Sequence, residues 1–139
     1  MIQREIQQQL LKLAAMYPVV TITGPRQSGK TTLAKMTFPQ HRYVSLENFD
    51  IRQMAEADPR GFLKSYAPPV IFDEIQRVPK LLSFIQTAVD EDKSYGQYIL
   101  TGSHQPALGA GVSQSLAGRT GILQLLPLSL SEMTASGIT

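Results

Sequence analysis

A glycine-rich stretch early in the sequence has the residue types and the spacing to bind phosphate. Residues 24–31 read Gly-Pro-Arg-Gln-Ser-Gly-Lys-Thr and match the pattern G-x-x-x-x-G-K-[ST] at every specified position. The glycines let the backbone curl around an anion, and the converging N–H groups meet the positive end of the following helix. The pattern predicts that Lys30 contacts the β- and γ-phosphates of a nucleotide and that the Thr31 hydroxyl binds Mg²⁺. The residues expected around the nucleotide are Gly24, Pro25, Arg26, Gln27, Ser28, Gly29, Lys30, Thr31 and Thr32.

The segments on both sides of this loop have the character that a phosphate-binding loop requires. Residues 19–23 are a β-branched run typical of a buried strand. Residues 30–36 suit the first turns of a helix, which Phe38-Pro39 ends. The alternative is a glycine-rich surface turn beside an ordinary helix. The succession of strand, loop and helix favours the nucleotide site.

Two adjacent acidic residues after a short apolar run form the second candidate site. Residues 70–72 are Val-Ile-Phe, and Asp73 and Glu74 follow at the expected C-terminal end of a buried strand. Acidic residues are disfavoured in buried strands, and open α/β sheets bind ligands at this edge, so the pair indicates a functional role. We expect Asp73 to hold Mg²⁺, often through water, and Glu74 to orient and polarise an attacking water. The alternative is an exposed turn with two solvated carboxylates.

Hydroxyl side chains also end another apolar run. Residues 97–100 indicate a buried strand that leads into Thr101, Gly102 and Ser103. At such a strand end, a polar residue could contact the γ-phosphate or the attacking water. The alternative is a hydroxyl group that caps the loop.

Arg119 stands out because residues 94–139 contain only one other formal charge, on Glu132. A segment so poor in charge is expected to be largely buried or to face something outside this chain. Arg119 precedes an apolar run at 120–126 and is a candidate for contacting the γ-phosphate in its own chain or in a neighbour's site. The alternative is a surface arginine that caps carbonyl groups or pairs with an acid.

The rest of the sequence predicts the elements that position these residues. Apolar residues at three- and four-residue steps predict an amphipathic helix over 2–16. Asp50 is expected to cap a helix over 51–56, and Asp58 with Pro59 marks the start of a helix to about residue 66. Pro79 is expected in the first turn of a helix through residue 89. Further strands are expected at 42–46 and 120–126, and Ser129 with Glu132 fits a capping box.

Composition sets the broad class of the protein. The 139 residues fit one globular domain, and a net charge of +2 with dispersed lysines and arginines does not support nucleic-acid binding. The absence of cysteine excludes disulfides and cysteine metal sites. No apolar run reaches membrane-spanning length and no signal-peptide core follows the first residues, so we expect a cytoplasmic protein without membrane contact.

Several of these segments together resemble a known family. The stretches at 24–33, 70–76, 98–103, 115–119 and 125–129 are similar to those of a group of bacterial and archaeal AAA-type P-loop ATPases, which often carry a C-terminal nuclease-like domain. The resemblance spans nearly the whole chain. The Ser-Leu-Ala-Gly-Arg stretch at 115–119 is more specific to this family than the phosphate loop is.

This resemblance implies an α/β fold, the P-loop NTPase three-layer α/β/α sandwich, with a parallel five-stranded sheet of order 5-1-4-3-2. It implies Thr31 and Asp73 as Mg²⁺ ligands, and the catalytic roles implied fall on Lys30, on Glu74 as base, on Ser103 or Thr101 as sensor and on Arg119 as a possible arginine finger. Residues 1–139 would form the ATPase core. Family members usually continue into a helical lid or winged-helix segment that this sequence lacks, so we expect the chain to be a piece of a longer protein.

The resulting prediction is an ATPase that uses ATP and Mg²⁺ and forms a possible homo-oligomer. Its nucleotide state would be coupled to an unidentified macromolecular partner or to the C-terminal domain. A second hypothesis is a nucleotide-gated interaction switch with little turnover, which the charge-poor last third motivates. A third, a small-molecule or nucleotide kinase, leaves Glu74 and Ser103 without a clear role.

Overall fold

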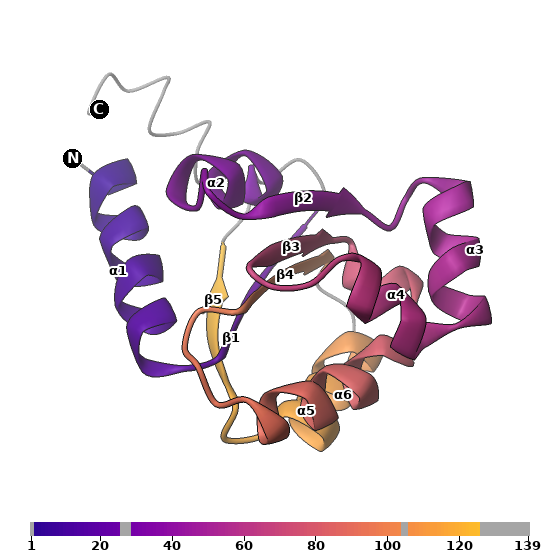
Figure 1. Ribbon diagram of the computed structural model, residues 1–139. Coiled ribbons are helices and arrows are strands. Elements are labelled where there is room, and N and C mark those ends of the chain that lie inside the picture. The colour runs from indigo at the N-terminus through magenta and orange to yellow at the C-terminus, as the bar shows by residue number, and fades with distance from the viewer. Residues whose placement is uncertain (1, 26–28, 104–105, 126–139) are drawn as a thin grey trace.

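Five parallel strands form one sheet in the computed structural model, which describes residues 2–25, 29–103 and 106–125 (Figure 1). The strands are β1 Val19–Gly24, β2 Arg42–Ser45, β3 Val70–Asp73, β4 Tyr98–Ser103 and β5 Thr120–Gln124. They lie in the order β2-β3-β4-β1-β5, and every neighbouring pair is parallel. This order confirms the predicted 5-1-4-3-2 arrangement, with β4 between β1 and β3.

Helices cover both faces of the sheet and complete the predicted three layers. One face packs against α1 Ile2–Met16 and α2 Lys30–Thr37, whose Leu10 and Leu33 are fully buried. The other face packs against α3 Phe49–Ala57, α4 Pro59–Ser65, α5 Leu81–Glu91 and α6 Pro106–Leu116 (Figure 1). Since each face needs apolar side chains, the central strands read as continuous apolar runs.

The side chains of the central strands alternate between the two cores. In β3, Ile71 joins the core under α1 and α2, whereas Val70 and Phe72 join the core under α4, α5 and α6. Ile99 and Leu100 of β4 divide in the same way. This period of two is the normal geometry of a strand. Because β1, β3 and β4 run parallel, their carboxyl ends lie at one edge of the sheet, where Gly24 pairs with Ser103.

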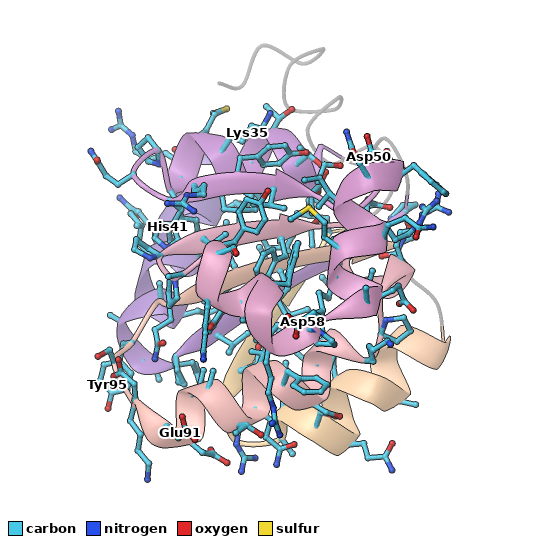
Figure 2. The ribbon with its side chains drawn as sticks, turned by 45° about the vertical axis from the view of Figure 1, so that its right-hand side comes forward. Lys35, His41, Asp50, Asp58, Glu91 and Tyr95 are labelled. Carbon is cyan, nitrogen blue, oxygen red and sulfur yellow. The ribbon has the colours of Figure 1, made fainter. Side chains whose placement is uncertain are left out.

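Two helix starts differ from their predictions. The side chain of Asn48 accepts a hydrogen bond from the backbone N–H of Ile51 at 3.1 Å, so Asn48 caps α3 and the prediction of Asp50 was wrong. Asp50 instead lies exposed in the first turn of α3 (Figure 2). Helix α5 begins at Leu81, so Pro79 precedes the helix instead of lying in its first turn. The start of α4 is as predicted, because Asp58 accepts from the N–H of Gly61.

The C-terminal third contains an element that the sequence did not predict. Helix α6 packs on α5, with Val112 and Leu116 buried in the core. Strand β5 is as predicted up to residue 124. The expected capping box of Ser129 and Glu132 lies outside the described residues.

Membrane-spanning length is not reached by any helix in the part of the chain that the structure describes.

Candidate functional site

The phosphate loop joins the end of β1 to the start of α2. Gly29 precedes α2 with φ 86° and ψ 11°, a left-handed conformation that glycine adopts without strain. Gly29 also has no side chain to cap the first N–H groups of α2, so these groups suit an anionic ligand. The predicted contacts of Arg26, Gln27 and Ser28 lie outside the described residues. Gly24, Pro25, Lys30, Thr31 and Thr32 are described, and their roles toward a nucleotide stay predictions.

Lys30 forms a buried ion pair with Glu74. Its Nζ lies 3.3 Å from Glu74 Oε1, and both side chains are less than a tenth exposed, at 5% and 7%. The same ammonium donates to the carbonyl oxygen of Pro25 at 3.4 Å. Buried charges need such partners, because water no longer stabilises them. The residue predicted to hold phosphate and the residue predicted to orient water therefore touch each other directly.

Asp73 receives hydrogen bonds at both carboxylate oxygens. Its Oδ1 accepts from the Thr31 hydroxyl at 2.8 Å and from the Thr101 hydroxyl, and its Oδ2 accepts from the Tyr43 hydroxyl at 2.6 Å. The two residues predicted to bind Mg²⁺, Thr31 and Asp73, are thus in contact. Partial burial, together with the hydrogen bond to Asp73, raises the pKa of the Tyr43 phenol above its ordinary value.

The backbone of Glu74 has an unusual conformation. Among the described residues it is the one non-glycine with a positive φ, at 61°, with ψ 54°. This conformation costs free energy for a residue with a Cβ and is found at functional sites. The Glu74 N–H donates to the Thr101 hydroxyl at 3.0 Å, and that hydroxyl donates to Asp73. Thr101 therefore links both acidic residues.

The Glu74 carboxylate has further partners on the side away from Lys30. Its Oε2 accepts from the Gln76 side-chain amide at 2.8 Å and from the Ser103 hydroxyl at 3.4 Å. The Gln76 Oε1 accepts from the backbone N–H of Ser103 at 3.3 Å. Ser103, at the end of β4, thus lies beside Glu74.

These residues border a small pocket at the carboxyl edge of the sheet. The pocket measures about 130 Å³ and is lined by Lys30, Thr31, Glu47, Asp73 and Glu74. Glu47, which follows β2, also lies 3.7 Å from the Arg77 guanidinium. Glu47 and Tyr43 were not predicted. Their position around β2, which pairs with β3, is the signal that could have found them.

The oxygen atoms at this pocket fit Mg²⁺. Thr31 offers a hydroxyl and Asp73 a carboxylate, and hard cations prefer such ligands. In the described part of the chain, no group of three histidine, cysteine or acidic residues is arranged to hold a metal by itself. Mg²⁺ commonly uses one or two carboxylates and completes its shell with water and substrate phosphates.

Arg119 lies at the opposite edge of the sheet. It directly precedes β5, and its carbonyl oxygen accepts from the N–H of Val19 at the start of β1. Its Nε and Nη2 donate to the two carboxylate oxygens of Asp90 at 2.7 and 3.0 Å, and Nη1 donates to Ala117 O at 3.1 Å. Figure 2 shows Tyr95, which lines the same pocket as Arg119, at the opposite corner of the view from Asp50, which lies in the first turn of α3. This position does not support contact with a nucleotide bound to the same chain.

The ion pair of Arg119 with Asp90 shifts the pKa of both residues. The hydrogen bond from Arg119 lowers the pKa of the Asp90 carboxyl, and the same bond raises the pKa of the Arg119 guanidinium. The alternative considered for Arg119, an arginine that pairs with an acid and caps a carbonyl, describes what the structure contains.

Comparison with known proteins places the chain in a family. A family model described as an AAA domain matches residues 16–134, which covers most of the sequence. The chain belongs to this AAA domain family. The parallel sheet with β4 between β1 and β3 is the AAA-type arrangement, and the phosphate loop makes this AAA domain a nucleotide-binding P-loop module.

Two mycobacterial relatives resemble the AAA domain in sequence. The uncharacterized proteins Rv2008c of Mycobacterium tuberculosis and Mb2031c of Mycobacterium bovis are each 33% identical to it over 122 residues. The match covers 86% of this chain and 27% of each relative, so the AAA domain spans about a quarter of their length.

A solved structure shares the fold. PCH-2 of C. elegans superposes with a TM-score of 0.58 and 13% identity, over 99% of this chain and 48% of PCH-2. At that identity the likeness concerns the fold alone.

Proposed function

We propose that this AAA domain binds ATP with Mg²⁺ and hydrolyses it to ADP and phosphate. The observation that carries the proposal is the contact between Lys30 and Glu74 beside the Thr31–Asp73 pair. A phosphate ligand, a metal ligand and a carboxylate base are then within one small pocket. The four residues that the sequence patterns single out are neighbours in the structure, and this closeness supports the proposal.

The residues would share the reaction as follows. Lys30 and the N–H groups at the start of α2 hold the phosphates and stabilise the charge of the transferring group. Thr31 and Asp73 hold Mg²⁺, which when bound neutralises charge on the phosphate oxygens. Glu74 orients a water molecule, whose oxygen bonds to the γ-phosphorus as the bond to the β–γ bridging oxygen breaks. Glu74 polarises that water and accepts its proton as ADP and phosphate form, and the proton then passes to solvent.

The ion pair of Lys30 with Glu74 supplies a simple order of events. Phosphate oxygens compete with Glu74 Oε1 for the same ammonium, since the two lie 3.3 Å apart. When phosphate binds Lys30, Oε1 is free to accept a hydrogen bond from water. Glu74 would therefore become available as a base once a nucleotide is in place.

Ser103 and Arg119 complete the proposal at different positions. Ser103 contacts Glu74 and would sense the γ-phosphate or the water from the end of β4. Arg119, on the opposite edge, would act on the site of a neighbouring copy, which requires at least a dimer. Without such an arginine, P-loop enzymes are slower by about 10³ to 10⁵.

The second candidate function is a nucleotide-gated switch with little turnover. The Lys30–Glu74 ion pair favours it, because nucleotide binding alone would rearrange this contact. The nucleotide state would then be read by a macromolecular partner or by a further part of a longer protein. A C-terminal nuclease-like domain, which the family resemblance suggested, would be one such part.

Binding and phosphate release separate the two functions. We expect the parent chain to bind Mg²⁺-ATP and release phosphate, and Glu74→Gln to bind without turnover. Lys30→Ala should bind Mg²⁺-ATP clearly more weakly, and equal binding would contradict the proposed site. If the parent and Glu74→Gln bind equally and neither releases phosphate, the switch is the better description.

A further inference from the structure

We propose that Gln76 is a positioning residue that holds the Glu74 carboxylate in its working orientation. The inference rests on the proposed ATPase function for its consequences, but the contact itself is independent of that function. Gln76 lies two residues after Glu74, in the short 3₁₀ turn η1 Ile75–Arg77. Its side chain is half-buried and reaches back to the acid instead of out to solvent.

The Gln76 amide contacts two different strand ends at once. Its Nε2 donates to Glu74 Oε2 at 2.8 Å, directly after β3, and lies 3.5 Å from the Ser103 hydroxyl. Its Oε1 accepts from the backbone N–H of Ser103 at the end of β4. The NH₂ group and the carbonyl oxygen of the Gln76 amide are therefore both hydrogen-bonded, and they connect Glu74 to Ser103.

The partners determine which way the amide points. Glu74 Oε2 is an acceptor and the Ser103 N–H is a donor. The reversed amide would place Gln76 Oε1 against a carboxylate oxygen and its NH₂ group against an N–H. Both contacts would be repulsive, so the observed orientation follows from the network.

The division of partners between the two carboxylate oxygens gives Gln76 its role. Oε2 is held by Gln76 and Ser103, whereas Oε1 contacts only the Lys30 ammonium among the described residues. When Lys30 turns to phosphate, Oε2 keeps its partners and Oε1 faces the same pocket. Gln76 thus fixes which lone pairs Glu74 presents to water.

The rotational freedom of the Glu74 carboxylate makes this support important. Glu74 has a positive φ and directly precedes the three-residue turn η1. Without a partner at Oε2, the carboxylate would rotate among its χ3 positions, which are broad for glutamate. Gln76 reduces this freedom at the atom that has to be directed.

Steady-state hydrolysis tests the positioning role. Gln76→Met keeps the length and removes the amide, so we expect kcat to fall about tenfold while KM and the Kd for Mg²⁺-ATP change less than about twofold. Gln76→Glu keeps an acceptor for Ser103 but sets a like charge beside Oε2, so its kcat should fall at least as far. Gln8→Met, on the exposed side of α1, is the matched control and should leave both parameters unchanged.

A second measurement uses the chain without nucleotide. A double-mutant cycle of Gln76→Met and Glu74→Ala, followed by denaturant unfolding, measures their coupling. Each single variant should raise the unfolding equilibrium constant, and either one already removes the shared hydrogen bond. The constant of the double variant should therefore be about tenfold smaller than the two separate increases multiplied together predict, because a hydrogen bond to a charged acceptor is strong.

The outcomes distinguish this inference from the ATPase proposal. The positioning role is overturned if the unfolding effects of the cycle are additive and Gln76→Met has an unchanged kcat. It is also overturned if Gln76→Met raises KM with kcat intact, or if Gln76→Glu keeps full activity. If the parent releases no phosphate but the coupling is measured, the ATPase proposal fails and the Gln76–Glu74 contact stands. A lower kcat with unchanged nucleotide affinity and a measured coupling supports both.

Discussion

At the scale of single residues, the site depends on hydroxyl groups that hold two acids. Thr101 bridges Asp73 and the Glu74 backbone, and Tyr43 donates to the remaining oxygen of Asp73. These hydroxyls fix the direction of the Asp73 carboxylate, which would bind a metal, and hold the backbone of Glu74, which would orient a water. Residues that orient metal ligands in this way commonly matter nearly as much as the ligands themselves.

Removal of the Tyr43 hydroxyl tests this support. Tyr43→Phe leaves Asp73 Oδ2 without its 2.6 Å hydrogen bond. We expect the Mg²⁺ concentration for half-maximal phosphate release to rise about tenfold, because the carboxylate loses its fixed orientation. Tyr95→Phe is the control, since Tyr95 is 65% exposed at the other end of the molecule. An unchanged Mg²⁺ requirement in Tyr43→Phe would show that Thr31 and Thr101 suffice.

Local sequence identified some of these residues and not others. Short local motifs with fixed spacing identified four of them: Lys30, Thr31, Asp73 and Glu74. Tyr43 lies thirty residues before its partner in the chain, and its contact exists because β2 pairs with β3. No local pattern encodes such a contact.

At the scale of elements, the fit of α1 against β5 is unusually close. Gly121 of β5 faces α1, and a Cβ at this position would lie 2.7 Å from Leu13 Cδ2 and 2.8 Å from Tyr17 Cδ2. Both side chains would have to move to admit a methyl group. This contact packs α1 on β5, the strand at the end of the sheet beside β1.

The close approach predicts a stability effect. Gly121→Ala should lower the free energy of unfolding by about 1–3 kcal/mol, because overpacking forces side chains from their preferred positions. Gln124→Ala, an exposed position on the same strand, should change it little. Chemical denaturation of both variants measures the difference. Equal stability of Gly121→Ala and the parent would mean that α1 shifts freely.

Helices with a clear apolar stripe or a recognised motif beside them could be predicted from the sequence, whereas α6 could not. Helix α1 has an apolar stripe, and α2 follows a recognised loop. Helix α6 contains Gly109 and Gly111 and has no charged residue, so it lacks a polar face. Its formation depends on packing against α5, and the sequence of the segment alone does not show that partner.

The ion pair of Asp90 in α5 with Arg119, just before β5, predicts how stability depends on pH. Because Arg119 lowers the pKa of Asp90 below the ordinary 3.8, the pair adds stability above that value and loses it as pH falls through the lowered pKa. Asp90→Asn should therefore be less stable than the parent at pH 7, and the difference should disappear as pH falls below 3.8 and through the lowered pKa of Asp90. The effect should be small, since the pair is exposed. Urea midpoints across this pH range measure it, with the neighbouring exposed Glu91→Gln as control.

At the scale of the whole molecule, the two edges of the sheet carry different groups. The carboxyl edge carries the pocket with Lys30 and Glu74, and the amino edge carries Arg119. If Arg119 serves a neighbour's site, one molecule's amino edge must meet another molecule's carboxyl edge. The arginine would first have to leave Asp90.

Mixing two inactive variants tests this arrangement. Lys30→Ala lacks a working site but keeps Arg119, and Arg119→Ala has the reverse defect. A mixture should release phosphate faster than either variant alone, because some associated pairs combine an intact site with an intact arginine. A mixture of Lys30→Ala with Glu74→Gln is the control and should stay inactive. A mixture no faster than its components would leave Arg119 as a structural partner of Asp90.

Because these groups lie at opposite edges, the way in which copies associate determines how many sites receive an arginine from a neighbour. Two copies lying side by side in opposite directions would complete both sites at once, so activity would saturate at the dimer. Copies stacked end to end would always leave one site at the end of the row incomplete, until the row closed into a ring. The way in which turnover per chain rises with concentration would therefore report which of the two assemblies this sheet can build.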